Sequence, residues 1–169
     1  MSREIKTGRG CYKSKVRDLV FVIKNIRWIL AIWIAFVFLQ SLFFKFSGSA
    51  ETQHIFGVLG TWSGFAWFAK YGAYGVGVVE LIASILLFTR WWGWGALLAF
   101  EVMCGAILFH LFTPLGIEMP VFENGLKTGK TDGGMLFIMA CLTWLAAILL
   151  LVKDWTSSGS QLRRILPSK

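Results

Sequence analysis

Four apolar runs, each about as long as a bilayer is thick, dominate this chain of 169 residues. They cover residues 27–46, 71–89, 93–113 and 134–152, and about 20 predominantly apolar residues let a helix cross the hydrocarbon core. The composition agrees, because 56% of the residues are hydrophobic, 15% are charged and the mean hydropathy is +0.65. The sequence therefore predicts an all-α integral membrane protein, a bundle of four transmembrane helices in contact with the lipid bilayer.

The placement of the basic residues predicts how this bundle is oriented. Seven of the seventeen Lys and Arg residues precede the first run and Arg27 is its first residue, four follow the last run, and Arg90 lies between the second and third. Basic flanks stay on the cytoplasmic side of a membrane. We therefore expect both termini inside, in a multi-pass protein of the inner (cytoplasmic) membrane. The net charge of +8 is then a topology signal, and no nucleic-acid partner is expected.

The organisation outside the four runs follows from the same map. Residues 1–24 form a basic cytoplasmic arm, residues 25–153 the membrane domain and residues 154–169 a basic tail. The apolar residues of the arm recur at helical spacing, which fits either an amphipathic helix on the membrane surface or a lead-in continuous with the first span. The apolar stretch 54–69 is short and contains three glycines, so we expect an interfacial or re-entrant segment on the outer face between the first two spans.

Two carboxylates, Glu80 and Glu101, lie near the middle of the second and third runs. An ionisable group at that depth costs roughly 2.5–3.5 kcal/mol on insertion scales, so it usually faces a partner, a cavity or a proton path. Small residues share the helical face of each acid, and for Glu80 they predict a side chain that points into the bundle. Counted from the intervening turn, the two acids reach similar depth. Both acids are expected to be buried in the bundle, and they are candidate catalytic residues, as a proton-handling pair or as hydrogen-bonded packing elements.

Three further polar residues are candidate ligand-binding groups. Gln40 lies within the first span, where it can hydrogen-bond to either acid across the bundle. Lys45 at the end of that span and His110 near the end of the third are expected to form a polar site at the outer face. His110 lies nine residues after Glu101, which puts the two on opposite faces of one helix.

Motifs for metals and cofactors are absent from the sequence. Its three cysteines form no C-x-x-C and no zinc spacing, so no metal site and no covalently bound cofactor are expected. The outer stretch 114–133 is polar, and Asp132 before the fourth run is predicted to cap that helix.

The chain resembles the DoxX-like (DoxX/DoxD) family of four-span membrane proteins over about residues 38–152. The motifs that carry the resemblance are Phe43-Phe44-Lys45-Phe46-Ser47-Gly48, Val79-Glu80-Leu81-Ile82-Ala83-Ser84, Leu86-Leu87-Phe88-Thr89-Arg90, Ala106 with His110, Thr113-Pro114-Leu115-Gly116-Ile117 and Asp132-Gly133-Gly134. The family implies a four-helix membrane bundle associated with redox metabolism. One branch contains a membrane subunit of thiosulfate:quinone oxidoreductase, and other members are proposed partners in oxidative-stress complexes.

The resemblance implies a membrane subunit that supports quinone-linked redox metabolism, of the thiosulfate/sulfur or the oxidative-stress type. Quinone is then the expected cofactor, and other membrane-protein subunits are the expected partners. The alternative is a non-catalytic accessory subunit that holds a larger membrane complex together. A binder of a small lipophilic molecule is a third option. The sequence leaves open whether the chain is itself an enzyme.

Overall fold

The computed structural model describes residues 4–157 and 159–163, with side chains from residue 25 onward. The described residues form five helices and one antiparallel hairpin: α1 (Glu4–Phe46), α2 (Ala50–Ser63), α3 (Ala66–Leu87), α4 (Trp92–Phe112), β1 (Pro120–Glu123), β2 (Leu126–Thr131) and α5 (Met135–Thr156). Within this described part, four helices are long and apolar enough to cross a membrane, namely α3, α4, α5 and the Asn25–Phe46 part of α1. The predicted all-α membrane class is confirmed.

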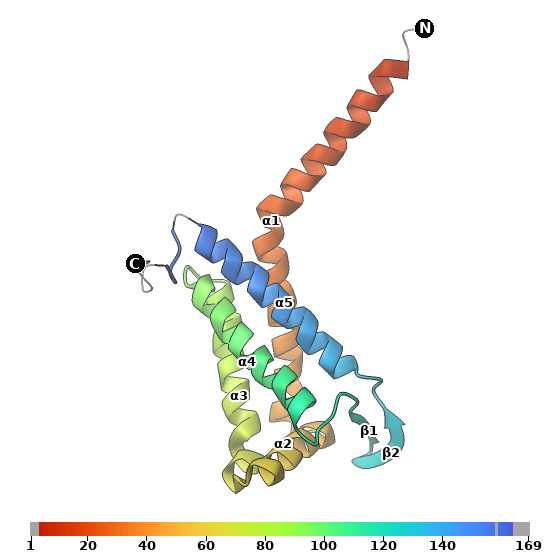
Figure 1. The fold of residues 1–169 in the computed structure, drawn as a ribbon, viewed down its shortest axis with the longest axis vertical. Coiled ribbons are helices and arrows are strands. Elements are labelled where there is room, and N and C mark those ends of the chain that lie inside the picture. Colours follow the sequence, from red (N-terminus) through yellow and green to blue (C-terminus); the bar gives the residue numbers. More distant parts are fainter. Residues whose placement is uncertain (1–3, 158, 164–169) are drawn as a thin grey trace.

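The four long helices pack as a ring in the order α1, α3, α4, α5. Each helix contacts the next and α5 closes the ring against α1, so α1 lies diagonally across from α4 (Figure 1). Small residues fill much of the interface, which lets the helix backbones approach closely. The shared core contains Ala31, Ile34, Phe38, Ala83, Leu87, Ala96, Ala99, Met103, Ala140, Ala146, Ala147 and Leu150.

The turn between α3 and α4 is tight. α3 ends at Leu87 and α4 begins at Trp92. Gly95 on the first turn of α4 faces α3 so closely that a Cβ there would lie 2.7 Å from the backbone nitrogen of Leu87. A glycine at this position is therefore required for the two helices to meet just after the turn.

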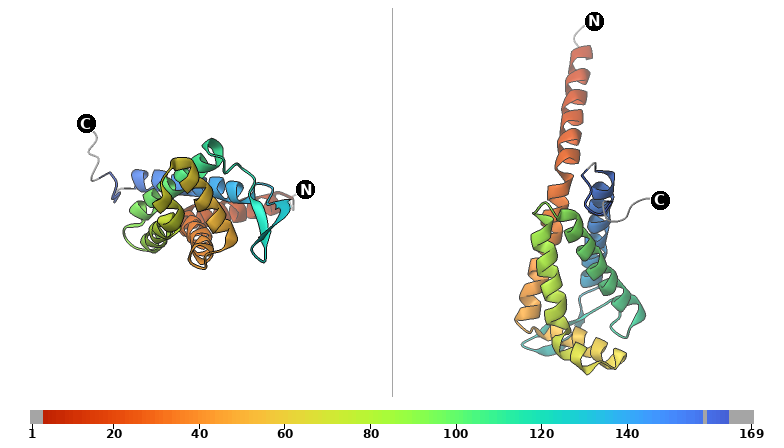
Figure 2. Two further views of the ribbon diagram at one scale, coloured as in Figure 1. Left: turned by 90° about the horizontal axis from the view of Figure 1, so that it is seen from below. Right: turned by 90° about the vertical axis from the view of Figure 1, so that its left-hand side faces the viewer.

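Helix α1 is continuous from Glu4 to Phe46. Its first half extends away from the bundle and its second half is part of the ring (Figures 1 and 2). Of the two alternatives for the arm, the backbone thus agrees with a helical lead-in that continues into the first span. The apolar helical segment begins at Asn25, two residues before the predicted start of that span at residue 27.

The apolar stretch 54–69 is not one element, in contrast to our expectation. It divides at Gly64, whose φ of 75° ends α2 in a left-handed C-cap, and its last four residues already belong to α3. The second span therefore begins at Ala66 and not at residue 71. Gly60 makes this helical pair possible, because a Cβ there would lie 2.5 Å from the Cβ of Ala69. α2 crosses the end of the bundle remote from the N-terminus (Figure 2).

The polar stretch 114–133 contains a β-hairpin that we had not predicted. β1 and β2 pair with Glu123 opposite Leu126, so the turn consists of Asn124 and Gly125. Both turn residues have positive φ, 51° and 79°, as in the type I′ turns for which Asn-Gly is the preferred sequence. The Asn-Gly pair was thus a usable hairpin signal. β1 packs against α2 at the same end of the bundle.

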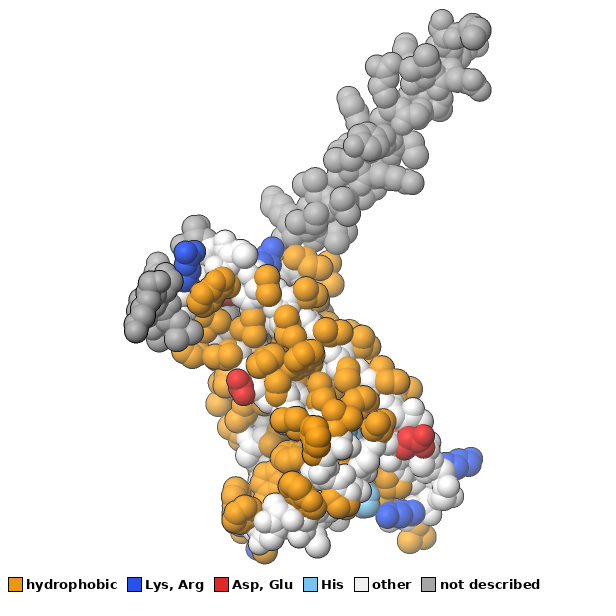
Figure 3. All heavy atoms as spheres, in the orientation of Figure 1, with side chains coloured by type: hydrophobic (Ala, Val, Ile, Leu, Met, Phe, Trp, Pro, Cys, Tyr) orange, Lys and Arg blue, Asp and Glu red, His pale blue; other side chains and the backbone are white. Residues whose placement is uncertain are grey.

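The face of the bundle seen in Figure 3 is largely apolar between its two ends. Exposed large hydrophobic side chains occur on all four membrane-length helices. A soluble domain rarely exposes so much contiguous apolar surface, and lipid accounts for it here.

Candidate functional site

An ion pair between α1 and α3 lies inside the bundle. The Lys45 Nζ atom is 2.7 Å from both Oε1 and Oε2 of Glu80. The Glu80 side chain is 2% exposed and the Lys45 side chain 12%. Lys45 Nζ also donates to the hydroxyl of Ser41, one helical turn earlier in α1, at 2.5 Å. The carboxylate in the second span is therefore neutralised from within the chain.

The direction of the two helices explains why these side chains meet. α1 and α3 are antiparallel neighbours, and each Cα–Cβ bond leans toward the N-terminus of its own helix. Lys45 in the last turn of α1 therefore leans back into the bundle, toward Glu80. The predicted inward face of α3 is confirmed, because Ala73, Gly77 and Ser84 are buried together with Glu80.

All hydrogen-bonding groups of the pair have partners. An ammonium group has three donors, and Nζ has three acceptors in Ser41 Oγ and the two Glu80 oxygens. The backbone carbonyl of Glu80 accepts a further bond from the Ser84 hydroxyl at 2.8 Å. The site is thus a closed, fully hydrogen-bonded ion pair.

Glu101 lies elsewhere. Its side chain is exposed on the outer surface of α4, whereas Glu80 faces α1. The structure therefore does not bring the two carboxylates together, although both lie in the middle part of their helices. Small residues beside Glu101 gave a misleading signal, because Gly105 faces open space in the described part of the chain. His110 lies on the buried face opposite Glu101, as its spacing predicted.

Gln40 is also placed outside the pair. Its side chain is exposed on α1, and its neighbour Ser41 supplies the polar contact that we had expected from Gln40. Successive residues of a helix point about 100° apart, so a shift of one residue is enough to exchange their roles.

His110 and Lys45 do not form a common polar site, in contrast to our expectation. The Nδ1 atom of His110 is hydrogen-bonded to the carbonyl oxygen of Gly116 at 2.6 Å, and its ring meets the ring of Phe137 edge-on at 5.8 Å. Lys45 instead leans into the bundle toward Glu80. His110 thus fixes the loop that leaves α4 and contributes to packing against α5.

Asp132 organises the chain before α5, although the N-cap position itself is Gly134 and not Asp132. Its Oδ1 atom accepts from the backbone N–H groups of Met119 (2.8 Å) and Gly134 (2.9 Å), and Oδ2 accepts from that of Leu136 (3.0 Å). Burial raises the pKa of this carboxyl, but the three N–H donors and the nearby His110 outweigh burial and hold the pKa below its ordinary value.

A second polar cluster lies at the opposite end of the bundle, and we had not predicted it. Asp154 in the last turn of α5 is 1% exposed. Its Oδ2 atom accepts from the Ser160 hydroxyl at 2.8 Å, and a Cβ on Gly93 would lie 2.8 Å from the Asp154 carboxyl. Two sequence features could have indicated this cluster, namely Asp154 just after the last apolar run and Gly93 at the start of the third. The cluster holds the described part of the C-terminal segment against α4.

Arg27 lies near the same end of the bundle. Its guanidinium lies over the rings of Trp28 (4.8 Å) and Trp92 (4.7 Å) and donates to the carbonyl oxygen of Thr89 at 3.2 Å. This arrangement ties the start of the first span to the turn between α3 and α4 by a cation–π contact.

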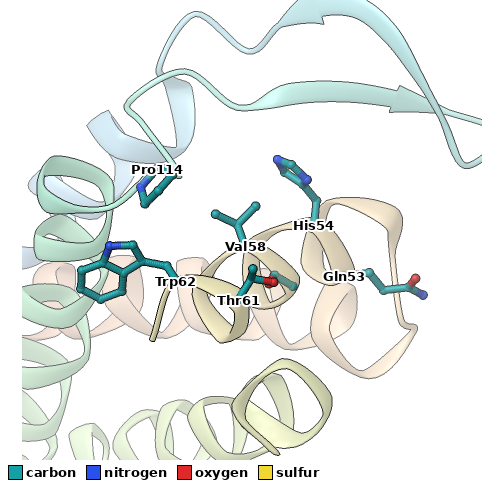
Figure 4. A pocket seen from close by; sticks show the side chains of 7 residues that line it. Gln53, His54, Val58, Thr61, Trp62 and Pro114 are labelled. Carbon is teal, nitrogen blue, oxygen red and sulfur yellow. The ribbon is translucent and has the colours of Figure 1, made fainter. Parts of the chain in front are cut away.

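A shallow groove of about 470 Å³ lies along α2 (Figure 4). It is lined by Gln53, His54, Gly57, Val58, Thr61, Trp62 and Pro114. Burial and the charge of Lys127 lower the pKa of His54 at one end of this groove. The lining residues differ from those of the ion pair, so the groove is a separate, mostly apolar surface feature.

Metal ligands do not cluster in the described part of the chain, where no group of three or more His, Cys, Asp or Glu side chains is placed to hold an ion. Cys104 and Cys141 are free thiols in half-buried positions. The indole Nε1 of Trp144 donates to the Cys104 sulfur at 3.0 Å, so Cys104 takes part in the contact between α4 and α5.

No family model, no curated protein and no solved structure matches this chain. The resemblance to the DoxX-like family accordingly stays a prediction from its motifs, and a functional proposal has to rest on the polar groups that the bundle buries.

Proposed function

We propose that this chain is a multi-pass membrane subunit that supports quinone-linked redox metabolism, with the Lys45–Glu80 pair as its proton-handling site. The observation that carries the proposal is the ion pair itself, a bidentate contact of 2.7 Å between an ammonium and a carboxylate inside an apolar bundle. Ionisable groups within membrane spans are costly and are usually retained for function. The redox assignment comes from the motif resemblance.

The chemistry of such a pair suits proton transfer. A proton on Nζ of Lys45 can move to an Oε atom of Glu80 along the existing hydrogen bond, which leaves a neutral amine and a neutral carboxylic acid. No net charge enters the bundle in this step, so the cost of moving charge in a low-dielectric medium is avoided. A neutral carboxylic acid can then donate the proton to an acceptor, and a second proton from outside restores the pair.

A quinone headgroup would reach this site under one condition. Its carbonyl oxygens accept hydrogen bonds, and Lys45 Nζ is the donor that they would use. All three donors of Nζ are occupied, so a carbonyl reaches Nζ by replacing the neutral Ser41 hydroxyl. In this proposal, a quinone supplies the two-electron chemistry, while the chain's own residues supply and receive protons.

The test compares variants of the chain in membranes of cells that lack the chromosomal copy of its gene. Glu80→Gln removes the proton acceptor, and we expect at least a tenfold smaller effect of the chain on the ratio of reduced to oxidised quinone. Glu123→Gln, at the exposed hairpin turn, is the matched control and should behave as wild type. A wild-type ratio with inserted Glu80→Gln protein would contradict the proposal.

A swapped pair separates chemistry from packing. Lys45→Glu combined with Glu80→Lys retains opposite charges but exchanges donor and acceptor between the helices. If the pair acts by proton transfer at a defined place, we expect the swapped protein to insert normally and remain inactive. Full activity of the swapped protein would show that the pair only holds the helices together.

A non-catalytic accessory subunit is the second candidate, and Glu101 favours it. A carboxylate exposed on the lipid-facing side of α4 calls for a partner outside the chain. In this case the Lys45–Glu80 pair locks α1 to α3 and the redox chemistry takes place elsewhere in the complex.

A further inference from the structure

Glu101 is an exposed acid in the middle of a membrane-length helix. It follows the first residue of α4, Trp92, by nine positions and precedes the last, Phe112, by eleven. At about 1.5 Å per residue, the side chain starts roughly 14 Å from one end of the helix and 17 Å from the other. It therefore sits near the centre of the bilayer, on the outer face of the bundle.

A carboxyl group in this position lacks hydrogen-bonding partners within the described chain. The hydrogen bonds and ion pairs of the described residues include none to the Glu101 side chain, and lipid tails provide none. Acids within membrane spans ordinarily face a partner or a cavity, because exposure to hydrocarbon is costly. The position of Glu101 thus points to an occupant of this face.

The surface beside Glu101 is shaped for a close contact. Gly105 lies one turn along the same face, and nothing in the described part of the chain comes within 4 Å of the position of a Cβ there. Leu108 follows two turns after Glu101 and is exposed. Small residues on a lipid-facing surface let a second helix approach closely. Glu101, Gly105 and Leu108 together form a stripe along α4, which we call the Glu101 face.

The positions of the basic residues in this chain decide whether a second copy of it could neutralise Glu101. Among the described membrane-length segments, the basic residues are Arg27, Lys45, Lys70 and Lys153. Lys45 already pairs with Glu80, and the other three each lie within five residues of an end of their segments, far from the depth of Glu101. A second copy of this chain therefore offers no free cation at the depth of Glu101 from its described spans.

We infer that the Glu101 face binds a transmembrane helix of another protein, one that carries a lysine or arginine near the centre of the membrane. This inference rests on the proposed role as a subunit of a larger complex, but it does not depend on the chemistry of the Lys45–Glu80 pair. The oppositely charged group pairs with the Glu101 carboxylate, and Gly105 brings the two helix backbones together.

Site-specific photo-cross-linking in native membranes tests the inference. A photoreactive phenylalanine analogue replaces Leu108 on the Glu101 face, and the control position is Leu39, an exposed residue of α1 across the bundle. We expect an adduct with another membrane protein at position 108 and at least tenfold less at position 39. Mass spectrometry should map the adduct to an apolar segment with a central basic residue.

A charge substitution gives the second arm. Glu101→Gln should lower the adduct yield at least tenfold, while the thermal midpoint of the purified chain in detergent stays unchanged because Glu101 makes no hydrogen bond or ion pair within the described residues. Glu101→Lys should abolish the adduct, and replacing the mapped basic residue of the partner by Glu should restore it.

Several outcomes would overturn the inference. These are adducts with lipid alone, with a second copy of this chain, or with a segment that lacks a central cation, and a yield that Glu101→Gln leaves unchanged. The quinone ratio of Glu80→Gln membranes is a separate readout. If that ratio is unaffected while the adduct forms, the proposed proton chemistry is wrong, but the inference that the Glu101 face binds another protein is supported.

Discussion

At the scale of single residues, the sequence allowed Glu80 but not its partner to be predicted. The small residues around Glu80 recur on one helical face, which indicated a buried side chain, and that was correct. Lys45 is the second-last residue of α1, where a lysine ordinarily extends to the headgroups. Its inward direction depends on the packing of α1 against α3, which a single sequence does not contain. The predicted burial of Glu101 was wrong, because small residues occur both on buried helix faces and on exposed faces that can bind another helix.

The ion pair should tolerate the loss of both charges much better than the loss of only one. Glu80→Leu or Lys45→Met alone leaves one buried charge without its partner, and we expect a loss of about 3–5 kcal/mol in the free energy of unfolding. The double variant removes both charges and should recover most of that loss. Thermal or denaturant unfolding in mild detergent measures the effect. Additive losses in the double variant would show that the two side chains are not coupled.

The contact between Gly93 and Asp154 should also be sensitive to mutation, though less than the ion pair. Gly93→Ala places a Cβ 2.8 Å from the Asp154 carboxyl, so the end of α5 has to shift, and we expect a loss of about 1–3 kcal/mol. Gly75→Ala is the matched control, since nothing described lies within 4 Å of its Cβ position and alanine favours a helix. A comparison of their unfolding midpoints tests this, and equal midpoints would contradict it.

At the scale of elements, hydropathy predicted helices well and irregular segments poorly. The boundaries of the third and fourth spans agree with α4 and α5 to within a few residues, because long apolar runs have one stable conformation in lipid. The stretch 54–69 was treated as one unit, although Gly64 ends one helix there and lets the next begin. The hairpin was missed because its strands have only four and six residues and β2 is mostly polar, which leaves the turn Asn124-Gly125 as the main signal.

Asp132 should make the hairpin end of α5 sensitive to acid. Its pKa is held below the ordinary value, so the stabilisation is complete above about pH 3.9, the unfolded-state pKa, and is lost as the pH falls through the lower folded-state pKa. Hydrogen-exchange protection of Met119, Gly134 and Leu136, corrected for intrinsic rates, should fall in that range. Asp132→Ala should cost about 1 kcal/mol at neutral pH and remove the pH dependence; an unchanged acid response would contradict this role.

At the scale of the whole molecule, the orientation in the membrane remains our prediction. If both termini are cytoplasmic, a green fluorescent protein fused to the C-terminus should fluoresce, and alkaline phosphatase fused there should be inactive. Alkaline phosphatase fused after Asn124, in the hairpin, should be active. The reverse pattern would place the hairpin and α2 on the cytoplasmic side.

The pairing of Lys45 with Glu80 also has a consequence for biogenesis. The two residues are 35 positions apart, so at a synthesis rate of about 5–20 residues per second the carboxylate is made about 2–7 s after the lysine. During that interval the first span has a cation near its end and no counter-ion. We therefore expect the ribosome-bound intermediate to hold Lys45 at the outer headgroups until the second span leaves the translocon, so that the first two spans enter the bilayer as one cooperative unit.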